Sequence, residues 1–310
     1  MDRGKLNSNL LLLITSIIWG FGFVAQEMGS DHLGPNAFNG TRYSVGAVCL
    51  LVILLLWHRG RAMDGFRSRD WVKASLSAGL FLFFGSLLQQ AGIGDESTGP
   101  GKAGFITGLY VVIVPLLGLG LGHRTNTQMW AGVALATVGL WLLSFNLDNE
   151  QRAIRRGDLL VFFGAFCWAA HVLVIDRFTN RVSSLHLALG QVTVCAGASW
   201  VASALAEPME LAGFRAAFLP ALYLGSMSIA VAFTMQIIGQ RKAHPTHASI
   251  IFAMEAVVGV FAGWLILHEQ LTQRELAGCL LMFCGMVLSQ LPVRLIRLGL
   301  TRRANDKPPA

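Results

Sequence analysis

The feature that most constrains the fold is a series of apolar blocks, each about 18–22 residues long, which is the length a helix needs to cross a ~30 Å hydrocarbon core. The blocks lie at 9–28, 37–57, 71–93, 98–121, 127–144, 157–175, 184–206, 216–239, 246–267 and 273–293. The longest hydrophilic connections, around 57–70 and 145–157, are too short to fold alone. The sequence therefore predicts an all-α polytopic membrane protein with ten transmembrane helices and a lipid bilayer as its surroundings.

Composition and charge agree with this class. Charged residues make up 13% of the chain, against about 25% in soluble proteins, and the mean hydropathy is +0.57. If the N-terminus is cytoplasmic, 17 of the 24 Lys and Arg residues lie on the cytoplasmic side and 7 on the outer side. The positive-inside rule then predicts a plasma (bacterial inner) membrane protein with both termini cytoplasmic. This asymmetry accounts for most of the net charge of +7, so a nucleic-acid partner is not expected.

The two halves of the chain resemble each other. A shift of 146 residues places Gln90 on Gln236, Ala131-Gly132 on Ala277-Gly278 and Gly139 on Gly285, and a shift of 149 places Trp19 on Trp168. Five spans per half is an odd number, so the second half enters the membrane from the opposite side. We expect two inverted five-helix repeats, residues 1–150 and 151–297, followed by a polar basic cytoplasmic tail, 298–310.

Four stretches carry a family resemblance: SIIWGFGFVAQ (16–26), TGPGKAGFITGLYVVIVPLLGLGLG (98–122), GDLLVFFGAFCWAAHVLVIDRF (157–178) and LHEQLTQRELAGCLLMFCGMVLS (267–289). With them the chain resembles the EamA-like, ten-helix branch of the drug/metabolite transporter superfamily. The resemblance implies a secondary transporter that exports small metabolites or xenobiotics by alternating access. One departure is Gly122-His123-Arg124, where the family usually has Gly-Glu before the fifth helix; the second half keeps Glu269.

Glu255 is the acidic residue in the middle of the ninth span, about 13 Å from its start by the helical rise. An ionisable group at this depth costs roughly 2.5–3.5 kcal/mol and usually faces a cavity or a partner. Gly259 and Gly263 continue its helical face and would admit a close neighbour, so we expect Glu255 to point into the bundle. It either serves the pathway, as a counter-charge for cationic or zwitterionic solutes or as a proton acceptor, or clamps helix packing.

The other candidates for the substrate pathway are polar or aromatic residues inside spans. They are Trp19, Gln89, Gln90, Tyr110, Trp168, His171, Gln191 and Gln236. The glutamines either contact substrate or join helices, the tryptophans either line the cavity or pack in the core, and His171 is either a relay or a hydrogen-bonded core residue. Gln90 and Gln236 lie late in their spans, which favours a gate or vestibule.

A further group lies near the outer ends of the first two spans. Gln26, Glu27 and Arg42 either extend to the lipid headgroups or form an outer gate, with a polar pair between Glu27 and Arg42. Pro115 interrupts the fourth span, where it removes a backbone hydrogen bond and can kink the helix, although proline is tolerated in membrane helices.

No cofactor and no metal site are expected. None of the five cysteines forms a ligand spacing, and the sequence has no GxxxxGK[ST] loop for a nucleotide, so gradients or a partner protein must supply the energy. Two other functions remain open at this stage. An intramembrane serine hydrolase would use Ser199 with His171 and the remote Asp176, and a channel would need charged rings or a filter loop that the sequence does not contain. The sequence leaves a monomer and a homodimer equally open.

Overall fold

The protein is described here by a computed structural model, which covers residues 3–58, 66, 68–95, 98–144, 155–266 and 272–290. These residues form helices connected by short turns, and eight of the spans are long and apolar enough to cross a membrane. The prediction of an all-α membrane protein with ten spans is confirmed. Seven spans are continuous helices: α1 (Arg3–Ser30), α2 (Pro35–His58), α3 (Arg69–Ile93), α6 (Thr127–Ser144), α7 (Arg156–Phe178), α8 (Ser184–Ala206) and α14 (Gln273–Gln290).

The other three spans are interrupted. The fourth consists of α4 (Gly99–Gly108) and α5 (Tyr110–Gly120), and the ninth of α12 (Pro245–Phe252) and α13 (Met254–Ile266). The eighth consists of α10 (Phe218–Tyr223), a π-helix (Leu224–Ala232) and α11 (Phe233–Gln240), and a short helix that was not predicted, α9 (Leu211–Ala216), precedes it. The expected tail, 298–310, lies outside the described residues.

The helix α5 continues through Pro115, and the fourth span is interrupted earlier, at Leu109. The matching interruption in the ninth span is at Ala253. At both places a backbone hydrogen bond spans three residues instead of four: Val112 N–H donates to Leu109 O over 3.0 Å, and Ala256 N–H to Ala253 O over 3.1 Å. One tight turn in the middle of each span therefore ends one helix and starts the next.

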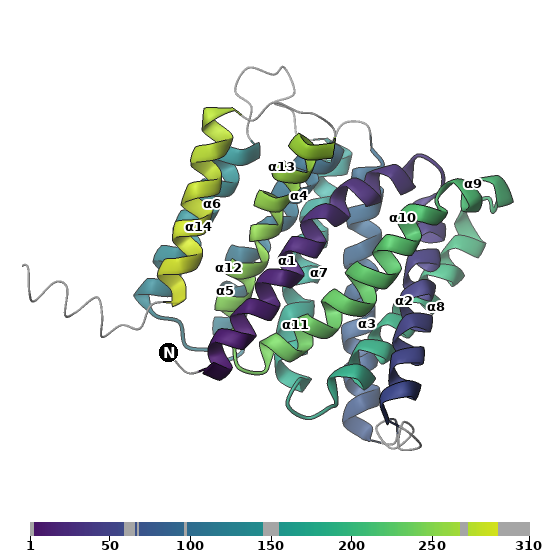
Figure 1. The fold of residues 1–310 in the computed structure, drawn as a ribbon, viewed down its shortest axis with the longest axis horizontal. Helices are drawn as coiled ribbons and strands as arrows, with labels where there is room; N and C mark the ends of the chain where they lie inside the picture. The colour runs from purple at the N-terminus through teal and green to yellow at the C-terminus, as the bar shows by residue number, and fades with distance from the viewer. Residues whose placement is uncertain are drawn as a thin grey trace, which may run out of the picture.

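The helices are arranged with pseudo-twofold symmetry (Figure 1). The last helices of the two halves, α6 and α14, lie side by side at one end of the molecule, and the second helices, α2 and α8, pair at the other end. Between them, α3 packs against α7 and α8, while its counterpart in the second half, the interrupted eighth span, packs against α1 and α2. Exchanging the two halves reproduces the same set of helix neighbours, as inverted repeats require.

Glycine contacts show this symmetry at the level of single residues. A Cβ added to Gly139 would lie 2.7 Å from the carbonyl oxygen of Gly278, and one added to Gly132 would lie 2.8 Å from that of Gly285. The 146-residue shift converts one contact into the other. No side chain fits at these crossings, so glycine allows the backbones of α6 and α14 to touch.

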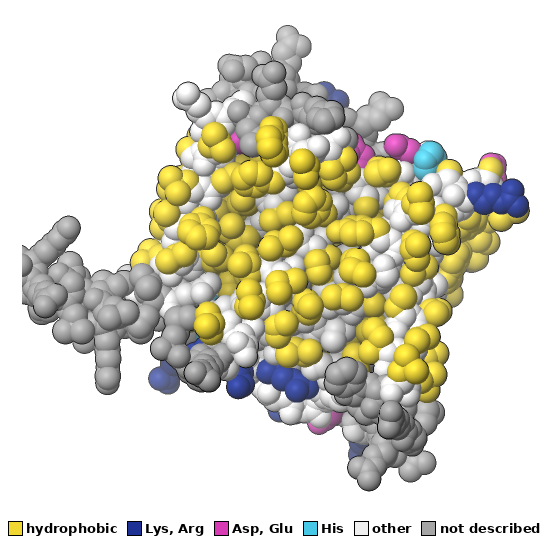
Figure 2. Space-filling view, in the orientation of Figure 1, with side chains coloured by type: hydrophobic (Ala, Val, Ile, Leu, Met, Phe, Trp, Pro, Cys, Tyr) yellow, Lys and Arg dark blue, Asp and Glu magenta, His cyan; other side chains and the backbone are white. Residues whose placement is uncertain are grey.

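The outer surface matches a hydrocarbon environment. Figure 2 shows a broad band of hydrophobic side chains across this face of the bundle, with charged side chains gathered near its two edges. Exposed apolar side chains of the spanning helices include Leu56 (73% exposed) and Leu280 (63% exposed). So large an apolar surface is stable in contact with lipid and would aggregate in water.

The α6–α14 crossing leads to a test of the architecture. Replacing Gly139 by leucine places a side chain where the backbone of Gly278 and the side chain of Met282 already lie within 2.7 Å of the new Cβ. We expect a destabilisation of about 1–3 kcal/mol, measured as a lower Tm of the detergent-purified protein. Gly197→Leu is the matched control, since Gly197 is helical, exposed and has no atom within 4 Å of its added Cβ. Equal Tm values for the two variants would contradict the predicted packing.

Candidate functional site

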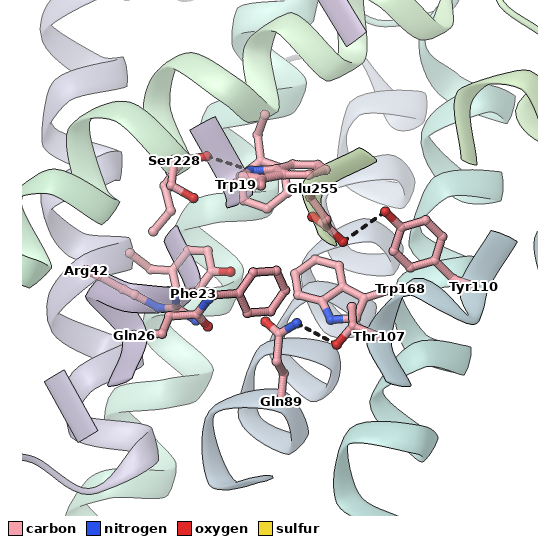
Figure 3. Close-up of a pocket in the computed structure, with 13 residues that line it drawn as sticks. Trp19, Phe23, Gln26, Arg42, Gln89, Thr107, Tyr110, Trp168, Ser228 and Glu255 are labelled. Carbon is pink, nitrogen blue, oxygen red and sulfur yellow. Dashed lines mark hydrogen bonds between the residues drawn. The ribbon is translucent and has the colours of Figure 1, made fainter. Parts of the chain in front are cut away.

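A cavity lies at the centre of the bundle, between helices of both halves (Figure 3). Its volume is about 50 Å³, so this conformation is nearly closed around its centre. Seven of the residues expected on the substrate pathway or at the outer gate line it: Trp19, Gln26, Arg42, Gln89, Tyr110, Trp168 and Glu255. The other lining residues are Phe23, Tyr43, Thr107, Ser228, Ile229 and Phe233.

Glu255 and Tyr110 meet where the two interrupted spans break. Tyr110 is the first residue of α5 and Glu255 the second of α13, and the Tyr110 hydroxyl donates a 3.0 Å hydrogen bond to Glu255 Oε1. Each is 4% exposed. One hydrogen bond thus joins the two halves at the cavity wall.

Glu255 lines the cavity, and α1 packs closely against the helical face that carries it. A Cβ added to Gly20 would lie 2.7 Å from the carbonyl oxygen of Glu255, and one added to Gly259 would contact the backbone of Gly20. The close approach expected from the glycine stripe is therefore made by α1, and it keeps lipid away from the face that carries Glu255.

Aromatic rings form the layer beside this carboxyl. The Trp19 ring lies 5.2 Å from that of Phe233 and 5.3 Å from that of Phe252, and Trp168 stacks on Phe233 at 6.4 Å with an interplanar angle of 14°. Trp19 Nε1 donates to the carbonyl oxygen of Ser228, which the wide π-helix presents to the cavity. We call Trp19, Trp168 and Phe233 the aromatic layer; its faces suit apolar or cationic groups.

Arg42 lies on the opposite wall and does not extend toward the headgroups, so that expectation is wrong for this residue. It is 4% exposed, and its Nε donates to Asn39 Oδ1 over 2.8 Å. Its guanidinium lies 5.7 Å from the Phe38 ring centroid and 5.3 Å from that of Tyr43. The anticipated polar pair is not formed, because the structure records no ion pair between Arg42 and the half-buried Glu27.

The two neighbouring glutamines of α3 separate two compartments. Gln89 Nε2 donates to Thr107 Oγ1 in the central cavity, whereas Gln90 Nε2 donates to the backbone oxygen of Gln26. Gln90 also lines a second pocket of about 440 Å³ between the ends of α1, α3 and α7, which we call the outer pocket. It lies on the side that the charge pattern predicts to be external, so Gln90 stands between the outer pocket and the centre.

Besides Gln90 and Glu27, three more predicted residues do not line the central cavity. His171 Nε2 lies 2.8 Å from Gln191 Oε1, and Gln236 is 1% exposed with neither amide atom bonded within the described part of the chain. The Phe233 ring, 5.8 Å from that of His171, separates this group from the cavity. We call His171, Gln191 and Gln236 the inner polar group. Although Gln90 and Gln236 are equivalent in the repeat, Gln90 lies beside the open outer pocket and Gln236 is enclosed.

The hydrolase triad is not assembled. His171 is bonded to Gln191, and Asp176 lies beside His123, with 3.7 Å between His123 Nε2 and Asp176 Oδ2. Ser199 is eight residues beyond Gln191 on α8, which is about 12 Å along the helix. Within the described residues, no group of three or more His, Cys, Asp or Glu side chains could hold a metal ion.

Several lining residues were not identified from the sequence. Phe23 lies four residues after Trp19 and three before Gln26, and both of these were predicted. Helical periodicity could therefore have identified Phe23 on the same face of α1. Thr107 and Ser228 gave no signal, since hydroxyl residues in membrane helices usually bond the preceding turn. Ser228 reaches the cavity through the π-helix, which the sequence did not reveal.

Comparisons with known proteins agree with the fold. The uncharacterized transporter YoaV of Bacillus subtilis is 24% identical over 90% of this chain and 94% of its own length. A protein of Escherichia coli named "probable amino-acid metabolite efflux pump" is 21% identical over 92% of this chain and 95% of its own. A solved crystal structure shares the fold with a TM-score of 0.75 at 19% identity, covering 93% of this chain and 98% of that one.

The family assignment follows from a match to both halves of the chain. The EamA-like transporter family matches residues 6–145 and again residues 155–291, so this chain, a multi-pass membrane protein, belongs to that family.

Proposed function

We propose that this protein is a secondary transporter that exports small amino-acid-like or amine-like metabolites, or xenobiotics of that chemistry, across the plasma (bacterial inner) membrane. The single observation that carries the proposal is the position of Glu255: a carboxyl 4% exposed, in an aromatic cavity at the junction of the two halves. The printed name of the Escherichia coli relative, a probable amino-acid metabolite efflux pump, supports the same substrate class.

The chemistry of the cavity supports coupling to protons. A buried carboxyl holds either a proton or a cationic group, since both use the same oxygens, and binding of one releases the other. Exchange of protons for amines at Glu255 would let an inward proton gradient drive export. The aromatic layer would bind the apolar part of the solute, and its indole faces would accept a cationic group passing Glu255.

Alternating access would come from movement of one half, residues 1–150, against the other, residues 151–297. The Tyr110–Glu255 hydrogen bond crosses that boundary, so loading of the carboxyl acts where the halves join. Two features support a cycle with two gates: the outer pocket ends at Gln90, and the inner polar group lies behind Phe233. Both termini then face the cytoplasm, as the positive-inside rule requires.

Glu255→Gln tests the proton coupling. The amide keeps the shape of the side chain and an oxygen for Tyr110, but cannot exchange a proton. The assay uses proteoliposomes preloaded with labelled amino acids. External acid should accelerate solute release by the wild type, and the acid-induced increase in release rate should be at least about tenfold smaller in the variant. Glu210→Gln, a change at an exposed carboxylate before α9, is the control and should behave as wild type. Unchanged acceleration in Glu255→Gln would remove the residue from the mechanism.

Counterflow separates a carrier from a channel or an enzyme. A carrier must return its site across the membrane, so unlabelled amino acid inside the vesicles should accelerate uptake of labelled amino acid from outside. Ser199→Ala should retain this trans-stimulation, because Ser199 is fully buried in α8 and does not line the cavity. Uptake that is insensitive to internal substrate would contradict a carrier, and loss of activity in Ser199→Ala would favour the hydrolase alternative.

A further inference from the structure

A second charged side chain shares the cavity with Glu255 and has no counter-ion there. Arg42 is the eighth residue of α2, about 10 Å along the helix from its outer end by the helical rise. A guanidinium remains charged under all physiological conditions, and a buried charge is costly unless it is paired. Within the described part of the chain, no carboxylate lies within 4 Å of Arg42.

The contacts that Arg42 does make leave its binding edge available. Nε donates to Asn39 Oδ1, and the rings of Phe38 and Tyr43 lie beside the guanidinium. Among the described residues, no hydrogen bond is recorded for its two terminal nitrogens, and Arg42 lines the central cavity. Two parallel N–H donors at the end of a fixed guanidinium are the arrangement that binds a carboxylate in bidentate fashion.

Other polar atoms in the same cavity are also unsatisfied. Gln26, which is 6% exposed, has a buried Oε1 with no partner among the described residues, and the same holds for Trp168 Nε1. Figure 3 shows Gln26 beside Arg42, with Trp168 on the side of Glu255 and Tyr110. The cavity therefore offers a cation, an anion, one acceptor and one donor around apolar rings, with no direct ion pair between Arg42 and Glu255.

The repeat shows that the fold itself does not need an arginine at this position. The carbonyl oxygen of Arg42 lies 2.8 Å from a Cβ added to Gly225, and that of Gln191 lies 2.9 Å from one added to Gly79. Gly225 and Gly79 are 146 residues apart, so Arg42 and Gln191 occupy equivalent positions on α2 and α8. The second half packs the same crossing with a neutral glutamine, which leaves the charge of Arg42 without a packing role.

We propose that Arg42 is the carboxylate-binding residue of the cavity, so that the transported solute is a zwitterion held between Arg42 and Glu255. Its carboxylate receives the terminal N–H groups of Arg42, its ammonium binds the Glu255 carboxylate, and its side chain contacts the aromatic layer. This inference rests on the proposed export function and narrows its substrate to amino-acid zwitterions. Arg42 is then the specificity-determining residue that separates amino acids from simple amines.

The test compares one amino acid with two derivatives that each lack one charge. The proteinogenic amino acids are first screened for uptake by wild-type proteoliposomes, and the best is used as the labelled substrate. Its amide, which lacks the carboxylate, and its N-acetyl derivative, which lacks the ammonium, serve as competitors. We expect each derivative to bind the wild type about ten- to a hundredfold more weakly than the parent amino acid, the range for a lost charged hydrogen bond.

The decisive variant is Arg42→Gln, which introduces the residue already present at the equivalent position of α8. Affinity for the amino acid should fall by about ten- to a hundredfold, while affinity for the amide stays unchanged, so that the two compounds bind alike. Arg42→Lys keeps a charge but not the paired donors. It should lower the affinity for the amino acid less than Arg42→Gln does, and it should also leave the affinity for the amide unchanged. It provides the same comparison if Arg42→Gln does not fold. Arg215→Gln, at an exposed arginine of α9, is the control.

Two results would overturn the inference. If the Arg42 variants lose affinity for the amino acid and for its amide equally, Arg42 supports the structure of the cavity and does not bind a carboxylate. A wild-type protein that transports amines in a Glu255-dependent manner but ignores amino acids would also overturn it, while leaving the proposed export function intact. Absence of transport for amino acids and amines alike would overturn both.

Discussion

The absence of water in the hydrocarbon core is the constraint on which this structure depends, because every polar group placed there must find its partner inside the protein. The constraint requires helices throughout the spans and turns the few polar side chains inward. It also gives the interruptions at Leu109 and Ala253 their importance, since broken helices at this depth persist only where protein or a cavity receives their free ends. Tyr110 and Glu255 stand at these two ends and bond to each other.

The pseudo-twofold symmetry explains how one site arises from two similar halves. The backbone crossings are shared, as the glycine contacts of α6 and α14 show, whereas the side chains at equivalent positions differ. Arg42 faces the cavity where its counterpart Gln191 binds His171, and Glu255 has no acidic counterpart near Leu109. The backbone packing is thus symmetric, whereas the polar and charged side chains at equivalent positions are not. A fully symmetric bundle would carry two equal half-sites and no single cavity with opposite charges on opposite walls.

Much of the fold could be predicted from the sequence because hydrocarbon thickness sets span length, and α6 and α8 have the predicted boundaries. Glu255 was identifiable for the same reason, since its burial follows from the cost of a charge in lipid. Arg42 was identified only as one of two alternatives, because an arginine near a helix end extends to the headgroups as readily as it turns inward, and only tertiary packing decides. The breaks at Leu109 and Ala253 were not predicted, since a tight turn in a membrane helix needs no signature residue.

The closed centre and the inner polar group together indicate how the two conformations of the proposed transport cycle can lie close in free energy. In this conformation the rings of Trp19, Trp168 and Phe233 pack together and separate the cavity from His171. This conformation leaves amide atoms of the inner polar group without hydrogen bonds. Among the described residues, neither amide atom of Gln236 is bonded, and Gln191 Nε2 is also unbonded. Each unsatisfied buried group costs about 1–3 kcal/mol, and water that reaches the inner polar group would satisfy these groups. Separation of the aromatic layer would therefore be offset by hydration of the inner polar group, so that binding energy of the size of one charged hydrogen bond can shift the equilibrium.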